Sequence, residues 1–137
     1  MNADFLDAHR RHMVDAETLF QASRLANADQ LYSFAAECGL KKLMSGFGML
    51  VTPDGSPTDR LDRVHADKVW GRYETYRFNN LSGANYVLPS PNPFHDWEAS
   101  QRYANSNDIL LPSVQAHKGA AETVAAMVRK AQLEGLI

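Results

Sequence analysis

An arginine and a histidine, Arg60 and His65, are separated by the four residues Leu61 to Val64. Such a pair could cleave RNA without a metal, because that reaction needs a general acid or base and a cation that stabilises the charge of the transition state. The chain has five histidines and many cationic residues, so this spacing also arises by chance. The alternative is a pair of surface side chains at the start of a helix.

A second candidate is the adjacent pair Arg102 and Tyr103, which lies just before a turn. Arg102 could bind a phosphate through two hydrogen bonds, and Tyr103 could stack on a base. In the structural alternative, Arg102 ties the loop to Asp96 or to a helix C-terminus, and Tyr103 packs against the protein. The sequence leaves both alternatives open.

Three histidines, His9, His12 and His117, lie on apolar faces of the expected helices. A histidine in such a place is most often a hydrogen-bonded core residue. His9 and His12 could instead share a metal with His117 across a helical bundle, or the three could line a polar pocket. Bundle metal sites generally include inward-facing carboxylates, and the chain has no Glu-x-x-His motif. We therefore predict no metal site and no cofactor.

Glu37 and Lys41 lie on the narrow polar strip of an otherwise apolar helix; the strip consists of Ser33, Glu37, Lys41 and Ser45. A Glu that precedes a Lys by four residues stabilises a helix by a few tenths of a kcal/mol when the pair is exposed. The pair could anchor a ligand or cross a dimer interface. The simpler alternative is a solvated ion pair.

The elements that must position these side chains are helices, because apolar residues recur with a period of 3.6. The period predicts a helix over residues 4–23, capped by Asn2 or Asp4, and a second helix that includes Leu31 to Met44 and is capped by Asn27 or Asp29. Further helices are predicted over residues 61–76, 96–103 and from about 109 to near the end, with Pro112 in the first turn of the last. No stretch shows convincing strand alternation. The prediction is one domain, residues 1–137, folded as an all-α, up-and-down bundle of four or five helices.

The composition narrows the class of protein. A formal net charge of −2 gives no overall attraction to nucleic acid or to anionic membranes, so an RNA-binding role would need a local basic patch. The single cysteine, Cys38, excludes an internal disulfide, and no apolar segment approaches the length of a membrane span. There is no P-loop motif and no dinucleotide-binding glycine motif. We expect a soluble cytoplasmic protein that does not enter a membrane.

Three segments carry a resemblance to a known family. The stretch "DAETLFQASRLANADQLYSFAAECGLKKLM" is similar to the first two helices of HEPN domains, in which the second helix commonly contains Ala-Glu-x-x-Leu-Lys. Here that motif is Ala36-Glu37-Cys38-Gly39-Leu40-Lys41. The segment "QRYANS" before the last helix resembles the Arg-Tyr segment of the family. The resemblance covers nearly the whole chain and implies a HEPN-like helical bundle.

The resemblance also implies a class of function. HEPN domains usually form homodimers and work around nucleotides or RNA; some are RNases, and others bind nucleotides or partner a nucleotidyltransferase. The cleaving members use an Arg followed after four to six residues by a His, a spacing that Arg60 and His65 match. Here, however, Leu61 stands where the family usually has a polar residue, and the pair lies earlier in the bundle than the family's motif.

The leading expectation is therefore a nucleotide- or RNA-associated binding or regulatory domain without robust catalysis. The first alternative is a metal-independent RNase that uses Arg60 and His65, with Arg102 as an accessory phosphate contact. The second is a protein-interaction module whose loop presents an aromatic ledge built from Trp70, Pro91, Phe94 and Trp97.

Overall fold

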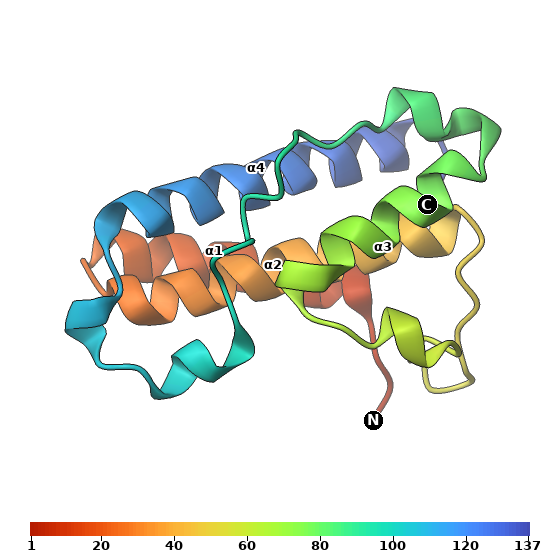
Figure 1. Ribbon diagram of the computed structural model, residues 1–137. Helices are drawn as coiled ribbons and strands as arrows, with labels where there is room; N and C mark the ends of the chain where they lie inside the picture. Colours follow the sequence, from red (N-terminus) through yellow and green to blue (C-terminus); the bar gives the residue numbers. More distant parts are fainter.

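The computed structural model describes residues 1–137 and contains four α-helices: α1 (Phe5–Gln21), α2 (Leu25–Gly46), α3 (Ala66–Phe78) and α4 (Leu111–Leu133) (Figure 1). There is no sheet; one isolated β-bridge joins Val51 to Pro57. The all-α prediction is confirmed. None of the four helices combines the length and the apolar character that a membrane crossing requires.

The first two helices form the predicted hairpin, and their ends show which polar residues cap them. Asp4 caps α1, since its Oδ1 accepts hydrogen bonds from the backbone N–H groups of Leu6 and Asp7, at 3.1 and 3.0 Å. The prediction that Asn27 or Asp29 caps α2 is wrong, because α2 begins at Leu25 and includes both residues. The Asp29 side chain is buried and bonds to other segments of the chain.

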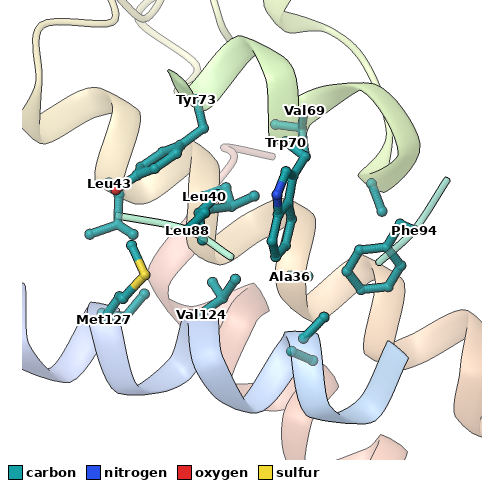
Figure 2. Close-up of a cluster of buried hydrophobic side chains, with 14 of the residues drawn as sticks. Ala36, Leu40, Leu43, Val69, Trp70, Tyr73, Leu88, Phe94, Val124 and Met127 are labelled. Atoms are coloured by element: carbon teal, nitrogen blue, oxygen red, sulfur yellow. The ribbon is translucent and has the colours of Figure 1, made fainter. Parts of the chain in front are cut away.

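Helix α2 is the central element, and it packs against α1, α3 and α4. Its apolar residues meet those of the neighbouring helices in a single core, to which the connection before α4 also contributes (Figure 2). Figure 2 labels Ala36, Leu40 and Leu43 from α2, Val69, Trp70 and Tyr73 from α3, Leu88 and Phe94 from the connection, and Val124 and Met127 from α4. Burial of these side chains is the main stabilising contribution to the fold.

The up-and-down order of the helices holds only for the first pair. Helices α2, α3 and α4 run in the same direction, as their colour gradients in Figure 1 show. Side-chain contacts also show that α2 and α4 are parallel: Asp29 near the start of α2 bonds His117 near the start of α4, and Gly46 at the end of α2 faces Leu136, just after α4. Two long connections, residues 47–65 and 79–110, return the chain along the bundle between successive helices. Up-and-down order requires short loops, which this chain has only between α1 and α2.

The long connections contain short 3-10 helices where longer elements were predicted. The predicted helix over 61–76 is divided into a 3-10 turn, Arg60–Asp62, and α3, which begins at Ala66. The break follows from Asp62, which is fully buried and accepts hydrogen bonds from Arg72 Nε and Tyr76 Oη at 2.8 and 2.5 Å. The predicted short helix over 96–103 is a 3-10 helix at Ala99–Tyr103, and others lie at Leu81–Asn85 and Ser106–Asp108.

The closest approach of the helices occurs at Gly39. A Cβ atom at this position would lie 2.5 Å from Val124 Cγ1 on α4 and 2.8 Å from His9 Nδ1 on α1. By contrast, a Cβ at Gly119 on the exposed side of α4 meets no atom within 4 Å. Replacing each of these two glycines with alanine therefore separates the effect of packing on stability from the effect of intrinsic helix propensity.

We predict that Gly39→Ala lowers the free energy of unfolding by about 1–3 kcal/mol, because overpacking outweighs the better helix propensity of alanine. Gly119→Ala should raise it by up to about 1 kcal/mol. Urea denaturation followed by circular dichroism measures both. A Gly39→Ala variant as stable as Gly119→Ala would show that the helices are not in contact at this point.

Candidate functional site

The polar strip of α2 is covered by other parts of the chain. Lys41 is 6% exposed, and its Nζ donates a hydrogen bond to Glu37 Oε1 at 2.7 Å. The predicted pairing is thus confirmed, but the interpretation as a solvated ion pair is wrong, since the connection 47–65 folds over it. A buried ion pair must be fully satisfied to be tolerated, because each charge loses its hydration.

The second oxygen of Glu37 holds His65. Its Oε2 lies 3.0 Å from His65 Nδ1, and a carboxylate accepts hydrogen bonds, so Nδ1 carries the proton. His65 is the residue before α3, and its side chain is 54% exposed. The neutral ring therefore offers its Nε2 lone pair, and the protonated ring offers an N–H, with no protein partner in either state. A carboxylate that orients an imidazole in this way is a common arrangement for proton transfer.

Glu37, Lys41 and His65 border a pocket of about 590 Å³, which we call the α2 pocket. Its walls come from the N-terminal segment, α2 and the connection 47–65, and its lining residues are Ala3, Phe5, Glu37, Lys41, Thr52, Pro53, Asp54, Ser56, Pro57, Arg63, Val64 and His65. The Phe5 ring lies 5.9 Å from Lys41 Nζ and covers the ammonium. This volume falls in the range of small-molecule sites.

The carboxylates of the α2 pocket accept hydrogen bonds from groups of the protein. Both oxygens of Glu37 are used, and Asp54 Oδ1 accepts hydrogen bonds from Thr52 Oγ1 and from the Ser56 N–H. The hydrogen bond from Thr52 is the main cause of a lowered pKa at Asp54, to which the charge of Arg63 also contributes. Glu37 is therefore bonded through both oxygens within the protein, whereas Asp54 is bonded through Oδ1 and its Oδ2 has no protein partner.

Arg63 brings unpartnered donors to the pocket. Arg63 uses its Nε to bond the Pro57 carbonyl at 2.9 Å, and its two terminal nitrogens have no protein partner. These nitrogens are free for an anionic group, and the protonated His65 ring adds an Nε2–H beside them. A guanidinium fixed through Nε still presents its terminal amino groups to phosphate or carboxylate oxygens.

Arg63 and His65 also border a second hollow. This hollow of about 380 Å³ shares Arg63, Val64 and His65 with the α2 pocket and extends over Asp67, Lys68, Glu98, Ala99 and Ser100. The free donors thus lie where two hollows meet, and a group bound there has space on both sides.

A separate charged cluster lies at His117, which is 1% exposed. Its Nδ1 donates to Asp29 Oδ1 at 2.6 Å and its Nε2 to Asp96 Oδ1 at 2.9 Å, while the Phe94 ring stacks on it with centroids 4.9 Å apart. Burial alone lowers the pKa of His117, but the hydrogen bonds that His117 donates to the two carboxylates more than offset it and raise that pKa. Gln101 donates to the other oxygen of Asp29. The imidazolium thus joins α2, α4 and the connection 79–110.

The other predicted residues do not join either cluster. Arg60 is exposed and does not border the α2 pocket. Arg102 lies over the ring of its own neighbour Tyr103, at 4.9 Å, and Tyr103 is 78% exposed. The alternative in which Arg102 ties the loop to Asp96 or to a helix C-terminus is not what the structure has, since Arg102 makes no side-chain hydrogen bond or ion pair and Asp96 is bonded by His117.

His9 and His12 do not meet His117. His9 is buried and donates from Nδ1 to the Ala35 carbonyl at 2.7 Å, as expected for a core histidine. Its pKa is lowered, mainly by burial, and so is that of the half-buried His12, whose ring lies 5.6 Å from Phe34. No group of three or more potential ligands is arranged to hold a metal ion.

The expected aromatic ledge is not on the surface. Trp70, Phe94 and Trp97 are each at most 5% exposed and fix the connection 79–110 to the bundle, which is the simpler role for aromatic residues there. Trp70 Nε1 donates to the Pro89 carbonyl at 3.2 Å. These rings are therefore not exposed to a partner protein, and the interaction module stays a prediction without this ledge.

The predictions from the sequence missed Arg63, and they gave Asp29 and Asp96 other roles, as a helix cap and as a partner of Arg102. Asp29 precedes Ser33 by four residues and so extends the polar strip of α2, which was a usable indication of a functional or structural charge. Nothing in the sequence distinguishes Arg63 from Arg60, because only the path of the connection decides which arginine borders the pocket.

The fold and the site define a four-helix all-α protein with a polar pocket beside its central helix. No known family matches the chain, and no curated protein or solved structure matches it either.

We predict that His117→Gln lowers the free energy of unfolding by about 3–5 kcal/mol at pH 6, because it leaves Asp29 buried without a counter-charge. The pKa of His117 is raised in the folded state, so its contribution is complete below the unfolded value of about 6.5 and is lost as pH rises through the folded value. The difference between wild type and variant should therefore shrink between pH 6 and pH 9.5, as urea denaturation at each pH measures.

His12→Gln is the matched control. The pKa of His12 is lowered in the folded state, so its contribution does not decline with rising pH. A His117→Gln difference that stays constant from pH 6 to pH 9.5 would contradict the charged state of His117.

Proposed function

We propose that the chain is a HEPN-like domain that binds the phosphate of a nucleotide or of RNA in the α2 pocket. The observation that carries this proposal is the pairing pattern of the pocket: both oxygens of Glu37 are bonded within the protein, while the terminal nitrogens of Arg63 keep donors without partners and the protonated His65 ring adds an Nε2–H. Such a pocket favours an anion, despite the overall charge of −2.

Two further features favour a nucleotide over a bare anion. The α2 pocket of about 590 Å³ is larger than a phosphate needs, and its lining combines Phe5 and prolines with the hydroxyls of Thr52 and Ser56. The resemblance of Ala36–Lys41 to the HEPN motif points to the same ligand class, and this segment contributes Glu37 and Lys41 to the pocket. The second hollow beside His65 gives room for a chain that continues beyond the phosphate.

We predict that AMP and a 5′-phosphorylated dinucleotide bind the purified protein and that Arg63→Gln weakens their binding at least tenfold. Loss of a charge-assisted hydrogen bond costs about 1.5–3 kcal/mol, which corresponds to a tenfold change or more. Isothermal titration calorimetry at two salt concentrations measures the dissociation constants, and added salt should weaken binding.

Arg24→Gln is the matched control, because Arg24 is exposed at the turn between α1 and α2 and has no side-chain partner. It removes the same charge from the protein without touching the pocket. Equal affinities of the two variants, or no binding of either probe to the wild type, would refute the proposal.

The second candidate function is a metal-independent RNase. The observation that favours it is the contact between Glu37 Oε2 and His65 Nδ1, which orients the imidazole and leaves Nε2 for proton transfer. The sequence pairs His65 with Arg60, but Arg63 is the arginine that borders the pocket with His65. Either arginine would have to supply the cation for the transition state.

Incubation with total RNA tests this function, with wild type, His65→Ala, Arg60→Ala and Arg63→Ala side by side. An RNase that works through His65 loses cleavage by a factor of 10²–10⁴ in His65→Ala. Cleavage that persists at the wild-type rate in His65→Ala, or no cleavage by the wild type, eliminates this candidate. The two arginine variants then tell which cation acts.

A further inference from the structure

A groove between α1 and α4 lies apart from both charged sites. Helices α1 and α4 run antiparallel to each other along α2, since Arg10 bonds Gln132 while Glu17 bonds Lys118. Between them is a hollow of about 330 Å³ whose apolar lining residues are Met13, Val14, Ala125 and Val128. A second hollow continues along α1 past Met13 and Val14 to Gln21. Val14 is 66% exposed at the rim.

The two ends of this groove carry opposite charges. Arg10 and Arg129 flank one end, and neither has a carboxylate partner; Arg129 has no side-chain partner at all. Glu17 and Glu122 flank the other end, where both share the single cation Lys118. One end therefore has two cations without counter-charge, and the other has one negative charge in excess.

The charges on the two helices have the same separation. Arg10 and Glu17 are seven residues apart on α1, and Glu122 and Arg129 are seven apart on α4, or about 10 Å along each helix. The apolar residues Val14 and Ala125 lie midway. A two-fold axis through this midpoint sets the cationic end of one copy against the acidic end of another, as a self-complementary interface requires.

We propose that the α1–α4 groove is the surface through which two copies of this chain associate. The second copy would cover the exposed Val14 and give Arg129 the partner that it lacks within its own chain, namely Glu122 of the other copy. The proposal does not depend on the α2 pocket. Two helices about 25 Å long and 10 Å wide present about 500 Å² per copy, which is the small end of specific interfaces.

Sedimentation velocity of the full-length chain over a range of concentrations tests the proposal. We expect a reversible dimer with a dissociation constant in the micromolar range for the wild type. Arg129→Glu and Glu122→Arg should each weaken it at least tenfold, because each variant by itself faces like charges across the axis. Arg102→Glu, an exposed charge reversal away from the groove, should leave the dimer unchanged.

Mixing the two weakened variants gives the decisive result. In a mixed pair, the glutamate at position 129 of Arg129→Glu meets the arginine at position 122 of Glu122→Arg, and the native Glu122 of the first meets the native Arg129 of the second. Both contacts are restored, so the mixture should dimerise as the wild type does. Circular dichroism confirms that each variant is folded. A monomeric wild type, an unaffected Arg129→Glu dimer, or a mixture that stays monomeric would each overturn the proposal.

Discussion

One row of polar side chains along α2 determines how the other segments of the chain are placed around this helix. Asp29, Ser33, Glu37, Lys41 and Ser45 follow one another at intervals of four residues, and the other segments of the chain cover the charged ones. A charge without water must find a partner, and each of the two carboxylates in this row finds one on another element. Asp29 fixes α4 and the connection 79–110 through His117 and Gln101, and Glu37 fixes the start of α3 through His65.

The row also explains why the two charged sites lie on different sides of α2. Residues spaced by four advance about 400° around a helix, so the row turns by about 40° at each step. Asp29 consequently faces α4, whereas Lys41 faces the connection 47–65. The serines need no partner on another element, because Ser33 and Ser45 bond the carbonyls of Gln30 and Lys42, each at 2.6 Å.

Much of this could be predicted from the sequence, and the limits have physical causes. The apolar period predicted all four helices, and the spacing of Glu37 and Lys41 predicted their ion pair, because both depend on neighbours along one helix. The start of α3 depends on Asp62, whose partners Arg72 and Tyr76 lie further along the chain. The candidate site was predicted as separate residues: Glu37, Lys41 and His65 were identified, but only the path of the connection 47–65 brings them together and adds Arg63.

The parallel arrangement of α2, α3 and α4 bears on how the chain acquires its structure. Only the hairpin of α1 and α2 forms from residues close in sequence. Each later helix docks after a long segment has closed into a loop, and this closure costs conformational entropy before the contacts of the docked helix can offset it. His117 bonds Asp29, from which most of the length of the chain separates it in the sequence. Tyr86 bonds Glu134, which also lies far along the sequence. Refolding should therefore be slower than that of a bundle of equal length with short turns, with the amino-terminal hairpin as the earliest ordered part.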